Sequence, residues 1–359
     1  MSCPEHIIDI RLNADGFWEP SITSEEKCIH CGMCLKNCAY YTTEDTYAKT
    51  EVKGYATWSL NSDIRNLSSS GGTGYEIARF LVGKGFTLCG VQYNEEKGIA
   101  EHYLADKIDG LQKSQGSKYI QSYTLGAFSE LDFSEGKYVV VGAPCQIASL
   151  SQFIKRKKAE DRFVLIDFFC HGVPSMFLWE KYTAEIGKRY GKIDKVQWRN
   201  KTTGWHDSWA MQLECDHGVF TSRMSQGDLF YKFFLGHYCL GRQCMKACRF
   251  KMTNSYADIR IGDLWGKTYA GDDDGVTGVL AFTAKGQAIM EAMTSIHKES
   301  VDSDVVCEGQ MRQNALEHPL RILTIKLMKS KFPLRTIDQI VSSIEVPFKV
   351  LRKMHIIKY

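Results

Sequence analysis

The sequence predicts an α/β protein with three parts: a small cysteine-rich module at the N-terminus, a domain built on a mainly parallel sheet, and a C-terminal subdomain with further cysteines. From about residue 68, apolar runs of strand length alternate with helical stretches, which is the pattern of a parallel sheet covered by helices. Most of the thirteen cysteines of the 359-residue chain lie in two groups, one in the first part and one in the last.

Residues 1–45 form the predicted N-terminal module. This segment is rich in cysteines and turn residues and has no long hydrophobic period. A segment of this size buries little apolar surface, so such modules depend on a bound metal for stability. We therefore expect a separate, metal-dependent unit.

The second predicted unit covers residues 55–205. Helical stretches are expected at 75–82, 147–154 and 177–186, and strand-like apolar runs at 86–93, 138–141, 163–169 and 195–198. This alternation predicts a mainly parallel sheet. Ligands are expected at the carboxyl ends of such strands.

The third predicted unit covers residues 206–300. The stretch SWAMQLECDHGVFTS at 208–222 has two alternating runs around an Asp-His-Gly turn, which predicts a β-hairpin. Residues 301–359 form a basic, helical tail, with nine Lys or Arg between positions 319 and 359. We favour a helix that packs on its own domain; the alternative is contact with an anionic membrane surface.

The composition indicates an ordinary globular protein, with 44% hydrophobic and 24% charged residues and a formal net charge of +3. We expect no nucleic-acid partner. No apolar run reaches the ~18–20 residues of a membrane span, so we expect a cytoplasmic protein. Because reducing compartments disfavour disulfides, thirteen cysteines there indicate metal ligation.

The run CIHCGMCLKNC has the spacing C-x2-C-x2-C-x3-C, which is typical of 4Fe-4S proteins. Zinc is the alternative, but zinc sites usually use two separated pairs of ligands. The fourth cysteine of such a run usually ligates a different cluster. We therefore expect Cys28, Cys31 and Cys34 to share a cluster, with Cys3, in the only Cys-Pro pair, as the fourth ligand.

Cys38 needs a different partner in this interpretation. The start Met1-Ser2-Cys3-Pro4 resembles the end of a second motif of the same kind, which predicts further cysteines upstream that share a cluster with Cys38. The alternative is that Cys38 is a free thiol or joins another metal site.

A second group of cysteines lies in CLGRQCMKACRF at 239–250, where three thiols are one short of a four-iron site. Cys145 and Cys170 each follow a predicted strand beside glycine or proline, so we expect both at the carboxyl edge of the sheet. The remaining isolated cysteines are expected to be ordinary small apolar residues: Cys89, Cys215 and Cys307.

Two loops have the composition of phosphate-binding segments. The stretch SSSGGT at 68–73 precedes a predicted helix, whose N-terminus favours a diphosphate. The stretch QGSKY at 115–119 combines a turn with a cation and an aromatic residue. Each loop alone is more often a plain turn or helix cap.

Together these segments resemble the coenzyme F-420 hydrogenase/dehydrogenase beta-subunit family, whose bacterial members have an N-terminal ferredoxin-like module and are often associated with polysaccharide biosynthesis. The resemblance covers about residues 17–290. It rests on SSSGGTG at 68–74, GSKYIQS at 116–122, GAPCQIASL at 142–150, FFCHGVPS at 168–175, RNKTTGW at 199–205 and CRFKMTNSYADIRIGDLWG at 248–266.

The resemblance implies an iron–sulfur flavoprotein with a mainly parallel flavin-binding domain, FAD, and one or two 4Fe-4S clusters. A flavin exchanges electrons in pairs and singly whereas a cluster exchanges them singly, so such a protein connects the two kinds of carrier. Flavin contacts are implied at Ser69, Ser70, Gly71, Gly72 and Thr73, with Gly116, Ser117 and Lys118 nearby. Cluster ligands are implied at Cys145, Cys239, Cys244 and Cys248, with Cys170 in reserve.

Two positions depart from the family pattern. Ala39 follows Cys38 where Pro is usual, and three residues instead of two separate Cys244 from Cys248. One extra residue changes the direction of every thiol after it, which affects the ligand assignment in that loop.

Three functions follow from these patterns. We favour a flavin-dependent reductase that acts on a small molecule or sugar and exchanges electrons with a partner such as ferredoxin. The alternatives are an electron-transfer subunit that docks on a catalytic partner and a zinc-stabilised interaction protein. Candidate substrate-pocket residues are Asp258, Asp263, Trp265, Arg199, Lys201 and Trp205.

Overall fold

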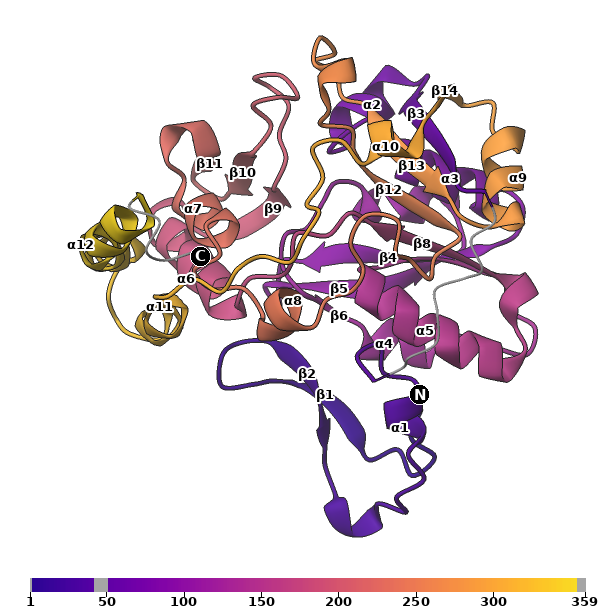
Figure 1. Ribbon diagram of the computed structural model, residues 1–359, viewed down its shortest axis with the longest axis horizontal. Coiled ribbons are helices and arrows are strands. Elements are labelled where there is room, and N and C mark those ends of the chain that lie inside the picture. The colour runs from indigo at the N-terminus through magenta and orange to yellow at the C-terminus, as the bar shows by residue number, and fades with distance from the viewer. Residues whose placement is uncertain (1, 42–50, 354–359) are drawn as a thin grey trace.

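The computed structural model describes residues 2–41 and 51–353, except for the side chains of residues 347–353. Figure 1 shows a small N-terminal module, a large β-sheet with helices beside it, and a smaller unit made of a short sheet and several helices. The predicted α/β class is confirmed.

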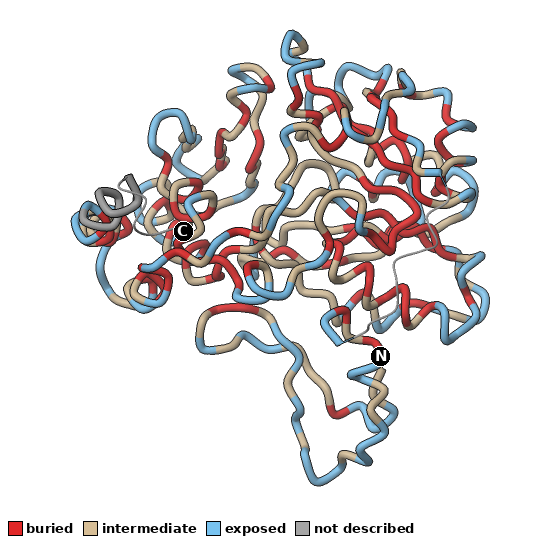
Figure 2. Tube along the Cα trace, in the orientation of Figure 1, coloured by how far each residue is buried: buried red, intermediate tan, exposed pale blue. Residues whose placement is uncertain are grey.

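The N-terminal module is a β-hairpin followed by a loop and one short helix. Its elements are β1 (Ile8–Leu12), β2 (Trp18–Ile22) and α1 (Met33–Lys36). Asn13 shapes the hairpin turn because its side-chain oxygen accepts hydrogen bonds from the amides of Asp15 and Phe17, at 2.9 and 3.0 Å. Figure 2 shows the module as mostly exposed or half-buried, as expected for a segment with almost no core.

The large sheet has nine strands in the order β14-β3-β13-β12-β8-β7-β4-β5-β6. The strands are β3 (Lys53–Ser59), β4 (Thr87–Asn94), β5 (Ile99–Ala105), β6 (Ser122–Tyr123), β7 (Tyr138–Val141), β8 (Phe163–Phe168), β12 (Ile259–Asp263), β13 (Thr277–Ala281) and β14 (Ile296–Val301). The apolar runs predicted at 86–93, 138–141 and 163–169 correspond to β4, β7 and β8, which are parallel neighbours in the centre.

The sheet is mixed, which corrects the prediction of a mainly parallel one. Strands β4, β7, β8 and β12 are parallel, and so are β5 and β6. The other four neighbouring pairs are antiparallel: β4 with β5, β12 with β13, β13 with β3, and β3 with β14. The order of strands and helices along a chain does not reveal in which direction the outer strands pair.

Helices cover both faces of the central strands. Helix α3 (Thr73–Val82) packs on the face to which Val139 points, and α5 (Pro144–Lys157) packs on the face to which Val140 points. Successive strand residues point to opposite faces, so both faces are buried and the strands are almost wholly apolar. The other helices of this region are α2 (Ser62–Leu67), α4 (Leu125–Ser129), α9 (Ala284–Ala292) and α10 (Ser303–Val306).

The smaller unit contains a three-stranded antiparallel sheet in the order β11-β10-β9. Its elements are α6 (Met176–Tyr190), β9 (Ile193–Gln197), β10 (Ala210–Cys215), β11 (Gly218–Arg223), α7 (Leu229–Leu235), α8 (Arg242–Lys246), α11 (Arg321–Met328) and α12 (Leu334–Lys353). The hairpin predicted at 208–222 is confirmed as β10 and β11. The run predicted at 195–198 lies in this sheet as β9, which corrects its place in the large sheet.

The predicted boundary between 55–205 and 206–300 does not separate two sheets. Strands β12, β13 and β14 return to the large sheet after the smaller unit, so the chain enters that unit and leaves it again. The chain therefore leaves the large sheet at the carboxyl end of β8 and, because β12 is parallel to β8, returns to the sheet at the amino end of β12.

The core of the smaller unit is aromatic, and the tail helix packs into it. Trp179, Trp198 and Phe230 are buried there together with Ile337 and Val341 of α12. This packing agrees with the favoured interpretation of the tail. In the described part of the chain no helix is long and apolar enough to span a membrane. The last part of the predicted membrane-contacting tail, residues 354–359, lies outside the described residues.

Candidate functional site

A cavity of about 1610 Å³ opens where the large sheet, the smaller unit and the N-terminal hairpin meet. It lies at the carboxyl ends of β7, β8 and β12, the edge at which parallel sheets bind ligands. Its walls come from five segments that are distant in sequence: 13–20, 68–75, 114–122, 141–146 and 168–173, together with residues that follow 234.

The glycine-serine loop, residues 68–72, connects α2 to α3 and packs tightly against the sheet. A Cβ atom at Gly71 would lie 2.4 Å from the carbonyl oxygen of Thr57, so only glycine allows this approach. Gly72 precedes α3 in the left-handed region, with φ of +86°. Of the eight implied flavin contacts, those that line the cavity are Ser69, Ser70, Gly72, Thr73, Gly116, Ser117 and Lys118.

The two loops with phosphate-binding composition form one continuous wall. The amide of Ser117 donates a hydrogen bond to Ser69 Oγ at 2.8 Å, and Gln115 Nε2 donates to Ser68 Oγ at 3.3 Å. Lys118 Nζ donates to three carbonyl oxygens of its own loop, at 3.0, 3.0 and 3.2 Å. Through these three bonds Lys118 holds the loop in its shape. Burial lowers the pKa of Lys118 to about 7.

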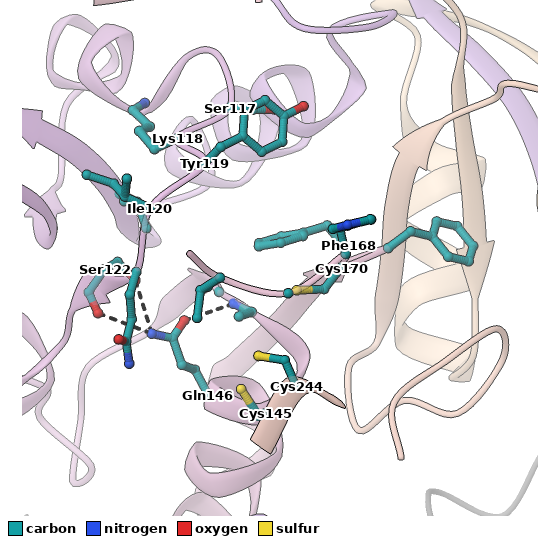
Figure 3. A pocket seen from close by; sticks show the side chains of 18 of the residues that line it. Ser117, Lys118, Tyr119, Ile120, Ser122, Cys145, Gln146, Phe168, Cys170 and Cys244 are labelled. Carbon is teal, nitrogen blue, oxygen red and sulfur yellow. Dashed lines mark hydrogen bonds between the residues drawn. The ribbon is translucent and has the colours of Figure 1, made fainter. Parts of the chain in front are cut away.

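Three cysteines from three segments gather on another wall of the same cavity (Figure 3). Cys145 lies in the first turn of α5, directly after β7, and Cys170 follows β8. Because β7 and β8 are adjacent and parallel, their ends bring these two thiols to the same edge. Cys244 reaches the site from α8.

The electrostatics of this site favour a cationic centre. Burial, followed by the neighbouring Cys244 thiol, raises the pKa of Cys145 and of Cys170 to about 12. Thiols in such surroundings stay protonated unless a metal holds them as thiolates. Cys248 belongs to the same group, because its charge affects Cys145 and both residues pack against Ala39. The donor set suits an iron–sulfur cluster.

Cys239 is not part of this group, which corrects the implied ligand set. It is fully buried in the aromatic core of the smaller unit, and its thiol faces the carbonyl oxygen of Phe233 at 3.9 Å. The neighbouring Leu240 pairs with Pro174 in an isolated β-bridge, which fixes the direction of Cys239 into the core. The reserve candidate Cys170 instead lines the cavity together with Cys145 and Cys244.

The cysteines of the N-terminal module lie around a second, much smaller hollow of about 40 Å³, lined by Cys3, Cys28, Cys31 and Cys34. Cys38 is absent from this group and lines the large cavity instead. Within residues 2–41 and 51–353, no three Cys, His, Asp or Glu side chains converge as they would around a single metal ion. A four-iron cube holds its thiolates further apart than one zinc ion does.

Only two of the six candidate substrate-pocket residues line the cavity, Asp263 and Trp265. Asp258 instead accepts hydrogen bonds from the Leu165 amide and the Thr283 hydroxyl, which is a structural role. The remaining three lie behind the wall: Arg199, Lys201 and Trp205.

Arg199 is the centre of a stacked assembly behind Asp263. Its guanidinium lies between the rings of Trp209 and Trp265, 4.8 and 5.0 Å from their centroids, and donates to Asp263 at 3.1 Å. Burial on its own would lower the pKa of Arg199, but Asp263 and Tyr119 together raise it above its ordinary value. The three partners of Arg199 in this assembly, Trp209, Asp263 and Trp265, all line the cavity.

Sequence reasoning missed several residues that line the cavity. Tyr119 lies in a quoted motif but was given no role, although its ring stacks on Trp209 at 4.9 Å and faces the cavity. Gln146 ties α5 to the opposite wall because its amide donates to Ser122 Oγ at 3.0 Å. Tyr40 had no signal in the sequence, because its role depends on how the module docks.

The comparisons with known proteins concern the fold and the family. No curated protein matches the chain. The fold is similar to that of a chain of the F420-reducing [NiFe] hydrogenase complex from Methanosarcina barkeri, with 17% identity, a TM-score of 0.50, and coverage of 84% of this chain and 95% of that chain. Residues 135–304 match the family model for the C-terminal part of the coenzyme F420 hydrogenase/dehydrogenase beta subunit. The matched residues include Cys145, Cys170, Cys244 and Cys248, and the match supports the resemblance of this chain to the coenzyme F420 hydrogenase/dehydrogenase beta-subunit family.

Proposed function

We propose that this chain is a flavin-dependent iron–sulfur oxidoreductase that passes electrons between a two-electron donor or acceptor and 4Fe-4S clusters. The observation that supports this most strongly is the single cavity lined both by the glycine-serine loop and by three thiols, those of Cys145, Cys170 and Cys244. The matching family model is named after hydrogenase and dehydrogenase subunits, which supports oxidoreductase chemistry.

A flavin dinucleotide such as FAD fits the cavity. Its volume of about 1610 Å³ exceeds the ~300–1,000 Å³ of ordinary ligand pockets, which leaves room for a substrate beside the cofactor. We expect the diphosphate to bind at residues 69–73, where hydroxyls, small residues and the N-terminus of α3 meet. Ser117, linked to Ser69, extends the same surface.

The residues of this chain would bind, orient and shield the cofactor. When bound, a flavin supplies exchange of two electrons on one side and of single electrons on the other. Cys145, Cys170, Cys244 and Cys248 would hold a cluster at the opposite wall. Phe168 and Tyr119 also line the cavity, where their rings would contact the cofactor.

We assign a second cluster to Cys3, Cys28, Cys31 and Cys34, which share the small hollow of the module. Cys31 and Cys34 are exposed, so this cluster would lie near the surface, as exchange with a redox partner such as ferredoxin requires. Cys38 lines the main cavity and has no assigned ligand role.

A second candidate function is an electron-transfer subunit that docks on a catalytic partner. The structurally similar chain is part of a hydrogenase complex, which favours this alternative. A small-molecule or sugar substrate would instead use the space left beside the flavin. The zinc-stabilised interaction protein is the third alternative, and metal analysis separates it from the other two.

Anaerobic reconstitution with iron and sulfide, followed by counts of iron, sulfide and flavin, tests the proposal. Cys145→Ala and Cys170→Ala should each lose about four iron atoms, the content of one cluster. Cys239→Ala and Cys215→Ala are matched controls and should keep the iron content of the wild type, because both thiols lie outside the group.

Zinc in place of iron, or a wild-type protein without bound flavin after reconstitution with FAD, would contradict the proposal. Equal iron losses in Cys239→Ala and Cys170→Ala would contradict the corrected ligand set. Turnover of a soluble one-electron dye by the purified chain with a hydride donor would favour an enzyme over a subunit.

A further inference from the structure

A short segment of the N-terminal module, residues 37–41, is fixed against the cysteine group of the main cavity. The amide of Ala39 donates to Ser149 Oγ at 3.0 Å, and Arg249 Nη2 donates to the carbonyl oxygen of Ala39 at 3.0 Å. Ala39 is 1% exposed and packs with Cys145 and Cys248. The segment therefore has a defined position beside two of the proposed cluster ligands.

Tyr40, in the middle of this segment, turns its hydroxyl toward those ligands. The hydroxyl lies within hydrogen-bonding reach of the Cys145 thiol and close to the thiols of Cys244 and Cys248. Although 40% of the Tyr40 surface stays exposed, the residue lines the main cavity.

We propose that Tyr40, contributed by the N-terminal module, is a tuning residue for the cluster on Cys145, Cys170, Cys244 and Cys248. Its O–H donates a hydrogen bond to the Cys145 thiolate and raises the reduction potential of that cluster. The reduced cluster has more negative charge on its sulfurs, so it gains more from the bond than the oxidised cluster does. This inference rests on the proposed function.

The arrangement makes the cluster of the main cavity depend on the N-terminal module in a specific way. The four proposed ligands all belong to the family domain, at positions 145 to 248, whereas the hydrogen-bond donor comes from residue 40. Docking of the module therefore sets the potential of a cluster to which it contributes no ligand.

A redox titration of Tyr40→Phe tests the inference, with Tyr41→Phe as the matched control. Tyr41 is the adjacent tyrosine and is 68% exposed. Tyr40→Phe should keep its iron, sulfide and flavin but show a more negative midpoint potential for one cluster. Tyr41→Phe should have the midpoint of the wild type. Resonance Raman spectra should show a higher iron–thiolate stretching frequency in Tyr40→Phe only, because the sulfur has lost its hydrogen bond.

Equal midpoints and equal Raman frequencies in Tyr40→Phe and the wild type would overturn the inference. If Tyr40→Phe loses the cluster, fluorotyrosine incorporated at position 40 alone gives the answer, because its more acidic hydroxyl should raise the midpoint. An unchanged midpoint there would also overturn the inference. A wild-type protein without a cluster on Cys145 would refute the proposed function instead.

Discussion

Lys201 lies behind the cavity wall and holds the glycine-serine loop in place. Its ammonium donates to the carbonyl oxygens of Arg65, Ser70 and Asp274, at 2.7, 2.7 and 2.6 Å. These three acceptors lie in α2, in the loop and in the segment before β13. The residue therefore joins the smaller unit to the proposed diphosphate site without touching the cavity.

We predict that Lys201→Met weakens flavin binding by roughly tenfold. Loss of the charged hydrogen bonds costs about 1–3 kcal/mol. Part of this free energy is lost from flavin binding, because the loop is then less well ordered. Flavin fluorescence titration measures the affinity. Lys192→Met, at an exposed position of the same unit, is the control and should bind flavin as the wild type does. Equal affinities in the two variants would show that the loop keeps its shape without Lys201.

Single residues were predictable where a local rule fixes them. The glycines of the loop and the cysteines that follow β7 and β8 were identified from sequence, and the structure places most of them on one cavity. Cys239 was assigned wrongly because spacing along the chain says nothing about a β-bridge that turns one side chain into the core. Lys201 was expected in the substrate pocket. Its structural role was missed because its backbone acceptors are distant in sequence.

At the scale of elements, hydrophobic periodicity located β4, β7 and β8 of the large sheet but not the way in which its strands pair. Strand β7 covers the four residues predicted, 138–141, and α5 contains the predicted stretch 147–154. Strands β3, β13 and β14 complete one edge of the sheet with antiparallel pairs that join residues more than 200 positions apart. Such pairings depend on the whole fold, so local patterns did not predict them.

The contact between the glycine-serine loop and β3 gives a test at this scale. We predict that Gly71→Ala destabilises the protein by about 1–3 kcal/mol, because the new Cβ would lie 2.4 Å from Thr57 O and 2.9 Å from Thr277 N. Both atoms belong to backbone, so neither can move cheaply. Gly271→Ala, where a Cβ meets nothing within 4 Å, should stay within about 0.5 kcal/mol of the wild type.

Thermal and urea unfolding measure both variants, and flavin retention should fall in Gly71→Ala alone. Equal stability of the two variants would mean that the loop can move away from the sheet at little cost. That result would also weaken the argument that the loop is a preformed diphosphate site.

At the scale of the whole molecule, the N-terminal hairpin closes one side of the cavity. The side-chain amide of Gln121 makes two hydrogen bonds to the backbone of Trp18, both at 2.8 Å. Ser175 Oγ donates to the carbonyl oxygen of Asp15 at 2.6 Å, and the Met176 amide donates to that of Gly16 at 2.8 Å. The module was predicted as an appended unit, and the sequence contained no sign that its hairpin reaches the cavity.

These bonds predict that the module controls how fast the flavin leaves. In Gln121→Ala the two bonds to Trp18 are lost, and at about 0.5–1.5 kcal/mol for each bond the hairpin should open roughly ten times more often. Amides of residues 13–18 should then exchange faster with deuterium, and flavin should dissociate faster, while the iron content stays that of the wild type. Gln112→Ala, at an exposed position before the same loop, is the control.

Replacement of Cys28, Cys31 and Cys34 by serine should also make the hairpin open more often. A module without its metal loses the element that stabilises it, so β1 and β2 should no longer hold the tip against Ser175. Flavin dissociation should then be at least as fast as in Gln121→Ala. If amide exchange at 13–18 rises in both variants but flavin dissociation does not change, the hairpin closes a part of the cavity that the flavin does not use, and that part becomes the place to look for the substrate.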